Sequence, residues 1–170
     1  SSARRLETRL LVKNAEGVYG VTYRWGNSVT NATLVSEQGL EESFVINNGG
    51  ILRTQVWRYP ARSECLTCHT PVAGFALGFN TTQLNRNDQI RALHEAGYFS
   101  APISNLHTLR ALAAPDDAAH SLEYRVRSYL AANCVQCHQP GGSALSTWDA
   151  RVTTPLSLAG IVNGTLNDYL

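Results

Sequence analysis

Residues 128–143 read SYLAANCVQCHQPGGS, in which two cysteines and a histidine form the pattern C-x-x-C-H. The same pattern occurs once before, where residues 63–71 read SECLTCHTP. We call residues 65–69 the first box and residues 134–138 the second box. The two boxes contain all 4 cysteines of the 170-residue chain, so the function of every cysteine has to be explained together with a neighbouring histidine.

The pattern C-x-x-C-H attaches haem covalently: both thiols bond to the vinyl groups of the ring, and the adjacent histidine binds the iron. The short spacing lets one turn of chain reach both thioether positions and the iron. The doubled pattern therefore predicts two covalently attached haem c groups. The residues predicted to hold the rings are Cys65, Cys68, Cys134 and Cys137, and the predicted iron ligands are His69 and His138.

Two other kinds of site that use paired cysteines are open alternatives. The first is a zinc site, but 65 residues (69–133) separate the pairs here, against about 15–20 in zinc ribbons. Zinc also gives no reason for a histidine after each pair. The second is a thioredoxin-like redox pair, which needs a βαβ context that neither box has. Haem is the favoured interpretation.

Each box supplies one axial ligand, so the sixth ligand of each iron must come from elsewhere. The chain has 0 methionines, and its remaining histidines are His94, His107 and His120. His107 is the first candidate, because it lies between Leu106 and Leu109 in an apolar stretch that should face another apolar surface. His94, on the edge of a helical pattern, is the second. An ordinary surface or packing role is the alternative for each of them.

The sixth ligand at the second box is harder to assign, because residues 139–170 contain no histidine, methionine or lysine. The ligand would be an upstream histidine, a tyrosine or asparagine of the tail, or a residue beyond the end of this sequence. The remaining alternative is an open site, which would admit peroxide, oxygen or nitric oxide.

The first 60 residues alternate between apolar and polar side chains, as half-buried β-strands do. Strand patterns occur at residues 5–14, 17–25, 43–46 and 54–59, and turn signals such as Glu16-Gly17 and NNGG (47–50) separate them. They predict four or five short antiparallel strands. Such a sheet needs a partner surface or further strands, so we expect assembly through this β module.

After Pro60 the pattern becomes helical. Helices are predicted at residues 86–99, at residues 103–115 and from a Ser121 cap to the second box, with a short one after Pro155. In the third helix the positions of one apolar face hold Leu122, Val126, Tyr129 and Leu130. The predicted fold class is α+β: an antiparallel β module at 1–60, forming part of a sandwich, then a mainly α-helical, cytochrome c-like dihaem region at 61–170.

Composition restricts the partners and the location. The net charge is +1, and no run of basic residues is interleaved with aromatic ones, so nucleic acid is not an expected partner. No apolar stretch approaches the roughly 18 residues of a transmembrane helix. The opening SSARR lacks Met and a visible signal peptide, as in a processed protein or a fragment. Because haem c is attached outside the cytoplasm, we expect a periplasmic, extracellular or cell-surface location.

Several longer stretches carry a family resemblance. They read RLETRLLVKN (5–14), TQVWRYPARSECLTCHTPVAGFALGFNTTQLNR (54–86), SLEYRVRSYLAANCVQCHQPGG (121–142) and WDARVTTPL (148–156). These stretches resemble the dihaem c-type cytochrome region of large secreted proteins of planctomycete and verrucomicrobial type. That region often shares a chain with PQQ-dependent sugar dehydrogenase-like β-propellers.

The resemblance implies further β-strands before the position of Arg4. It also implies a continuation past the position of Leu170, with a methionine suited to the second haem. The stretch NLHTLRALA (105–113) is similar to the closest members of the family, which favours His107 as the distal ligand of the first haem.

These inferences favour a module that transfers single electrons over an enzyme. The expected partner is a redox protein such as a dehydrogenase or another cytochrome. Arg62 and Arg151 are candidate partners for the haem propionates. Two alternatives are kept: a dihaem peroxidase-like enzyme with one open haem, although such enzymes are longer, and a subunit of a haem-containing assembly or filament.

Overall fold

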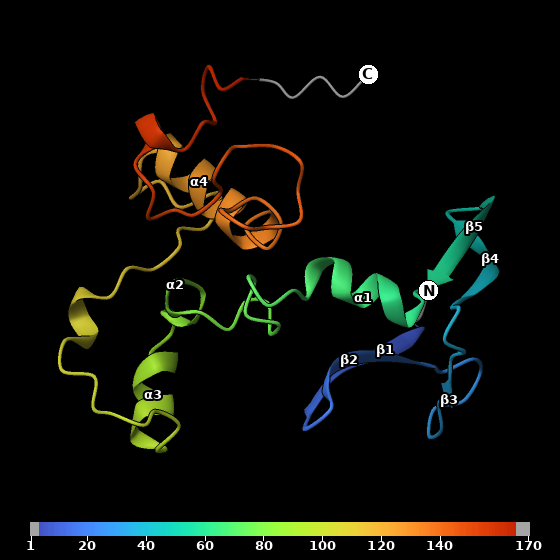
Figure 1. The fold of residues 1–170 in the computed structure, drawn as a ribbon. Helices are drawn as coiled ribbons and strands as arrows, with labels where there is room; N and C mark the ends of the chain where they lie inside the picture. Colours follow the sequence, from blue (N-terminus) through green and yellow to red (C-terminus); the bar gives the residue numbers. More distant parts are fainter. Residues whose placement is uncertain (1–3, 166–170) are drawn as a thin grey trace. The chain divides into compact units, whose positions relative to one another are not determined.

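The computed structural model describes residues 4–165 and shows a mixed α+β chain (Figure 1). The chain divides into two compact units, Ser1–Cys68 and His69–Leu170. This division lies later than the change of sequence pattern after residue 60, because helix α1 (Arg62–Cys68) packs against strand β2 (Gly17–Arg24) and so belongs with the strands. Whether 1–60 and 61–170 are separate modules stays a prediction.

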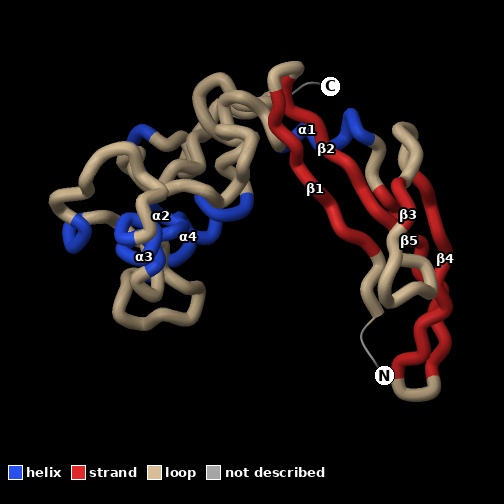
Figure 2. The backbone as a smooth tube through the Cα atoms, turned by 90° about the horizontal axis from the view of Figure 1, so that it is seen from below, coloured by secondary structure: helices blue, strands red, loops and turns tan. Residues whose placement is uncertain are grey.

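The strands of the first unit form two antiparallel sheets (Figure 2). Strands β1 (Glu7–Asn14), β2 and β3 (Thr33–Leu34) pair in that order, and β4 (Leu40–Asn48) pairs with β5 (Ile51–Tyr59) as a hairpin. The described residues therefore contain five strands, which confirms the prediction of four or five antiparallel ones. Helix α1, which precedes the first histidine, was not predicted, because seven residues carry no clear helical period.

Asparagine side chains hold two of the predicted turns. The side-chain oxygen of Asn14 accepts hydrogen bonds from the backbone nitrogens of Glu16 and Gly17, between β1 and β2. That of Asn47 accepts one from the nitrogen of Gly50, between β4 and β5. Such contacts explain why asparagine and glycine in the sequence predict these turns.

A buried tyrosine and an ion pair connect the two sheets of the first unit. Glu42 of β4 accepts two hydrogen bonds from Arg24 of β2, at 2.6 and 2.7 Å, and one from the Tyr59 hydroxyl at 2.8 Å. The hydrogen bonds from Arg24 outweigh the effect of burial and lower the pKa of Glu42 to about 2. Tyr59 is only 1% exposed, whereas the Arg24 and Glu42 side chains are 36% and 22% exposed, so the cluster extends from the interior to the surface of the first unit.

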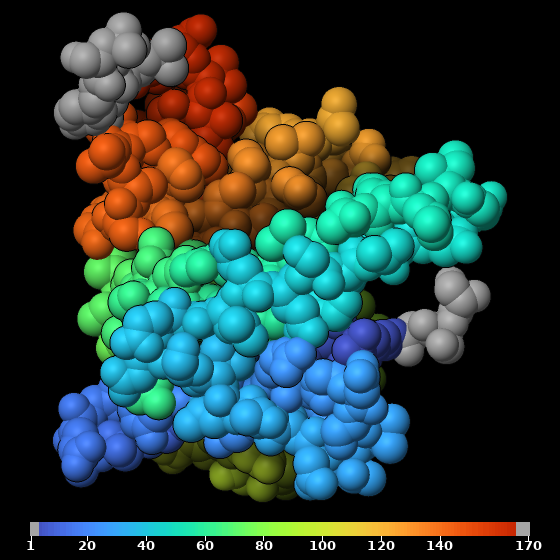
Figure 3. Space-filling model, turned by 90° about the vertical axis from the view of Figure 1, so that its right-hand side faces the viewer, coloured from blue at the N-terminus to red at the C-terminus, as the bar shows by residue number. Residues whose placement is uncertain are grey.

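The β4–β5 hairpin exposes much of its apolar surface. Val45 and Ile51 are 70% and 74% exposed, and Leu52 and Val56 are also exposed. Figure 3 shows the hairpin atoms, drawn in cyan, at the surface. This exposure agrees with the prediction that the β module does not bury all its apolar side chains by itself.

The second unit contains short helices joined by long connections. Helix α2 (Thr81–Leu84) is followed by α3 (Gln89–Glu95), which occupies only the middle of the helix predicted at 86–99. Asn87 and Asp88 have left-handed φ angles of 50° and 57°, so the helix begins only after them, and Gly97, at a φ of 77°, lies beyond its end. After Pro155 the predicted short helix exists as a 3₁₀ turn, η2 (Leu156–Leu158).

The helix predicted at residues 103–115 is wrong, since this segment forms only the 3₁₀ turn η1 (Leu106–Thr108). Hydrogen bonds to other elements replace the intrahelical ones. The nitrogen of Leu112 donates to the carbonyl of Thr82, that of Ala113 to the Ser128 hydroxyl, and the Tyr124 hydroxyl to the carbonyl of Ala111. The segment is therefore extended against its neighbours, although its apolar spacing is helical.

Helix α4 (Leu122–Asn133) was predicted correctly in position and cap, but its orientation is the reverse of what its apolar stripe suggests. The Ser121 hydroxyl accepts a hydrogen bond from the nitrogen of Tyr124, as a cap should. However, Leu122 and Tyr129 are 67% and 56% exposed, whereas Arg127 and Ser128 are buried.

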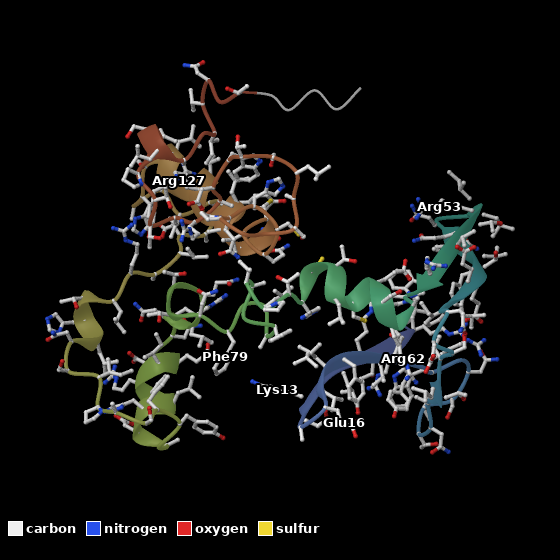
Figure 4. All side chains as sticks on the ribbon, viewed as in Figure 1. Lys13, Glu16, Arg53, Arg62, Phe79 and Arg127 are labelled. Carbon is white, nitrogen blue, oxygen red and sulfur yellow. The ribbon has the colours of Figure 1, made fainter. Side chains whose placement is uncertain are left out.

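Hydrogen bonds explain this reversal. Nη2 of Arg127, labelled in Figure 4, donates to the carbonyls of Arg151 and Thr154, and Ser128 accepts from Ala113 as described above. The polar face of α4 thus binds backbone groups of the neighbouring loops. Among residues 4–165, no helix has both the length and the apolar character needed to cross a membrane.

Candidate haem attachment sites

In the first unit, helix α1 carries both cysteines of the first box. Cys65 and Cys68 are three positions apart on this helix, so their side chains lie on the same face, as attachment to a single ring requires. All four cysteines of the chain are half-buried. The Cys65 thiol lies 3.9 Å from the carbonyl oxygen of Ala61, one turn earlier.

Gly20 of β2 makes room for Cys65. A methyl group added at Gly20 would lie 2.5 Å from the sulfur and 2.7 Å from the β-carbon of Cys65, which is closer than atoms can approach. A larger residue at this position would therefore displace the thiol. Sequence reasoning missed Gly20, because a glycine within a strand pattern indicates only that something approaches closely and not what does.

In the second unit, His69 is oriented by the loop that follows it. Its Nδ1 lies 2.6 Å from the carbonyl oxygen of Phe75. A carbonyl can only accept, so Nδ1 carries the proton and donates it, and the lone pair of the ring remains on Nε2. Nε2 is then the atom that can bind a metal.

The Phe75 carbonyl is held in place by a strained turn. Phe75 has a φ of 60°, a left-handed conformation that non-glycine residues rarely adopt, and Gly74 before it has a φ of 74°. The nitrogen of Phe75 donates to the carbonyl of Thr70, and the nitrogen of Ala73 donates to the Thr70 hydroxyl. Strain of this kind persists only where surrounding contacts enforce it, and it is common at binding sites.

The second box begins where α4 ends. Cys134 is the C-terminal cap of the helix, and its carbonyl accepts hydrogen bonds from the nitrogens of Cys137 and His138 at 3.1 and 2.9 Å. These bonds fold the second box into a single turn that contains its two cysteines and its histidine. The box is therefore supported by the longest helix of the described chain.

Two side chains of the loop after the box contact the ring of His138. Its Nδ1 lies 2.7 Å from the Ser146 hydroxyl, and its ring stacks on Trp148 with the ring centres 4.1 Å apart. The carbonyl of His138 accepts a hydrogen bond from the nitrogen of Ala150. Since a hydroxyl can donate or accept, Nε2 can bind a metal when Nδ1 carries the proton and Ser146 accepts it.

Gly142 lets the loop turn back on the second box. A β-carbon at this position would lie 2.1 Å from the carbonyl oxygen of Cys137. This close approach occurs in a turn where the nitrogen of Gly142 donates to the carbonyl of Gln139.

Asp149 anchors the loop that carries Ser146 and Trp148. It is 6% exposed and accepts hydrogen bonds from Arg151 and from the Thr154 hydroxyl. Burial alone would raise the pKa of Asp149, but the hydrogen bonds from Arg151 and Thr154 outweigh it and lower the pKa to about 2. Asp149 is therefore ionised at neutral pH.

The two arginines named as propionate partners both have carboxylate partners in the protein. Arg151 pairs with Asp149, and Arg62 pairs with Glu37 at 2.8 Å. Arg151 also lines the cleft described below. Contact of either arginine with a haem propionate stays a prediction.

The candidate sixth ligands are placed on different elements. His107 is exposed on η1, because the helix predicted around it does not form. His94 is half-buried on α3, with its ring centre 6.5 Å from that of Phe99. His120 is exposed, 3.7 Å from Asp117 and beside Tyr124. The role of His107 or His94 as an iron ligand stays a prediction.

A cleft of about 660 Å³ lies within the second unit, a size typical of pockets for organic ligands. Its walls come from three segments: residues 72–83 after the first box, residues 131–139 at the end of α4 and in the second box, and residues 151–153. Phe79, labelled in Figure 4, lines it and is 63% exposed. The segments next to both boxes thus border one apolar-lined space.

Three or more histidine, cysteine or acidic side chains do not gather into a possible metal-binding group anywhere in residues 4–165. A haem needs less from the protein, because the porphyrin supplies four of the iron ligands and the protein only the axial ones. The half-buried thiols and the two oriented histidines fit that requirement. Comparisons with protein-family models, with curated proteins and with solved structures give no match to this chain.

Proposed function

We propose that this chain is a dihaem c-type cytochrome module that transfers single electrons outside the cytoplasm. One observation carries the proposal: in both boxes, the histidine has its Nδ1 engaged by a protein oxygen, at 2.6 and 2.7 Å, so that Nε2 is left for iron. A metal-binding histidine typically has this arrangement, because the second contact fixes the tautomer and the ring orientation.

The chain and the haem would have distinct tasks. The haem iron supplies the one-electron chemistry by cycling between its ferric and ferrous states. Cys65, Cys68, Cys134 and Cys137 hold the rings, and His69 and His138 bind the irons. The polypeptide controls the solvent access of each ring and the orientation of each axial ligand.

The resemblance to the cytochrome region of large secreted proteins supports this proposal through the sequence. On that basis, residues 61–170 are a cytochrome c-like region, and the strands before them belong to a β-sandwich-like module. The partner would be a dehydrogenase or another cytochrome. The exposed apolar side chains of the β4–β5 hairpin favour assembly through the β module.

A peroxidase-like enzyme is the second candidate, and one observation favours it. Residues 139–170 hold no histidine or methionine that could be the sixth ligand of the second iron. If that iron keeps an open position, it binds small oxidants instead of only passing electrons. An assembly subunit or filament protein would use the same haems for conduction.

Absorption and EPR spectra of the oxidised and reduced protein separate these functions. The protein should be made in a bacterial host that exports it and attaches haem c. Two low-spin, six-coordinate haems are the expected result for electron transfer. A high-spin signal that changes on addition of peroxide or carbon monoxide would instead favour the enzyme, because it shows an open position on one iron. Zinc in a metal assay, without iron, would overturn both.

A further inference from the structure

When Nε2 of a neutral histidine binds iron, Nδ1 carries the proton and donates, so the two box histidines would have different kinds of acceptor. Nδ1 of His69 faces a backbone carbonyl, that of Phe75, in a half-buried contact. Nδ1 of His138 faces the hydroxyl of Ser146, in a contact exposed to solvent. The distances are nearly equal, 2.6 and 2.7 Å, so the chemistry of the acceptor is the main difference.

An acceptor at Nδ1 changes the properties of the nitrogen on the other side of the ring. When Nδ1–H donates to an oxygen, the imidazole becomes a more basic ligand. A more basic axial ligand stabilises ferric over ferrous iron, and hydrogen bonding around the site is one of the factors that set a haem potential. A carbonyl is a stronger and more constant acceptor than a hydroxyl, which can rotate and also serves as a donor.

The surroundings reinforce this contrast. The Phe75 carbonyl cannot turn away, because the strained Thr70–Phe75 turn fixes it. The Ser146 hydroxyl is exposed, so water competes with it for the hydrogen bond to Nδ1 of His138. Stacking on Trp148 holds the plane of the His138 ring, so Ser146 acts on a ring that is otherwise immobilised.

We propose that Ser146 is a positioning residue that tunes the haem of the second box independently of the first, by accepting the Nδ1 proton of His138 and so lowering the potential of that haem. This inference rests on the proposed function.

The test is a potentiometric titration of the whole holoprotein and of variants at position 146. Ser146→Ala removes the acceptor and should raise one of the two potentials, by up to about tenfold in the ferric–ferrous equilibrium, or about 59 mV for a one-electron couple. Ser146→Asp supplies a stronger acceptor and should lower the same potential. Ser146→Thr keeps the hydroxyl and should restore the original value.

Thr147→Asp is the matched control, because it adds the same charge at the next, exposed residue. The other potential, that of the first-box haem, should stay constant in every variant. NMR of the His138 ring proton should show faster exchange in Ser146→Ala. The proposal is overturned if Ser146→Ala moves neither potential, if both potentials move together, or if Ser146→Asp and Thr147→Asp act alike.

Haem content measured beforehand keeps this failure apart from failure of the proposed function. A protein without two haems would contradict the function itself. A protein with two haems whose potentials ignore position 146 would contradict only the role of Ser146.

Discussion

The first and second boxes share the pattern C-x-x-C-H but are supported in different ways. In the first box the cysteines lie on α1, whereas in the second they follow the last turn of α4. Cys65 approaches a strand glycine, Gly20, while the backbone of the second box approaches a loop glycine, Gly142. The comparison teaches that two copies of one five-residue pattern can have different surroundings, so that the proposed haem sites would share their attachment chemistry and differ in the residues around it.

The two glycines offer the most direct way to disrupt one box and spare the other. Gly142→Ala should nearly abolish haem attachment at the second box, because its β-carbon would lie 2.1 Å from a backbone oxygen that cannot move aside. Gly20→Ala should reduce attachment at the first box to a smaller extent, since the 2.5 Å contact is with the Cys65 side chain. Haem per chain, measured by absorbance, reports the loss.

Each variant is the control for the other. Gly20 and Gly142 both lack a positive φ, so alanine introduces only the close contact and no backbone strain. Loss of haem from both boxes in either variant would indicate general misfolding and contradict the assignment of each glycine to its own box.

Removal of His107 tests whether this histidine occupies the sixth coordination position of the first iron. If His107 is the distal ligand, His107→Ala should convert one low-spin haem to a high-spin haem in the EPR spectrum, while the other signal persists. His120→Ala, a change at another exposed histidine, serves as the control and should leave the spectrum intact. An unchanged spectrum in His107→Ala would contradict this ligand and direct attention to His94.

Acid should weaken the support of the second box through Asp149. The folded pKa of about 2 lies below the ordinary value of 3.8, so this carboxylate stabilises the fold at higher pH, and its contribution is lost as the pH falls from about 4 to 2. Asp149→Asn should lower the free energy of unfolding by about 1–3 kcal/mol at pH 7. Urea unfolding at several pH values measures both effects.

Two control variants make the acid experiment specific. Asp116→Asn, at an exposed aspartate, should change stability little. Glu42→Gln removes the corresponding carboxylate of the first unit, whose pKa is also about 2, and should destabilise the protein without altering the second-box haem spectrum. Equal spectral changes in Asp149→Asn and Glu42→Gln would contradict a local role for Asp149.

The smallest effect is expected at the cap of α4. Ser121→Ala removes the hydroxyl that accepts from the nitrogen of Tyr124 and should cost about 1 kcal/mol. Ser121→Asn keeps a capping oxygen and should cost little. The difference between these variants, measured by thermal unfolding, should vanish if the helix that leads into the second box does not depend on its cap.

Local signals in the sequence predicted the asparagine turns, the cap of α4 and four of the five strands, but not the two-residue β3, because each predicted feature depends on residues a few positions apart. The prediction of a helix at residues 103–115 failed because hydrogen bonds to α2 and α4 replaced the helical ones. The prediction that the apolar face of α4, with Leu122 and Tyr129, is buried failed for a related reason. Polar groups on the opposite face bind backbone carbonyls, and apolar periodicity does not reveal such contacts.

The candidate sites show the same limit. The two boxes were recognisable because cysteines and histidines have distinctive side chains. The Phe75 carbonyl left no side-chain signal, and Ser146, eight residues beyond His138, is one serine among many. The contacts that distinguish the two histidines arise from loop conformation and are visible only in the folded chain.

The intact mass of the denatured protein tests the central claim most directly. The holoprotein should weigh as much as the polypeptide plus two haems, since thioether bonds survive denaturation. Replacing both cysteines of either box by alanine should remove one haem from the mass and leave the other. A mass equal to the bare polypeptide, in a host that attaches haem c to a control cytochrome, would contradict the account.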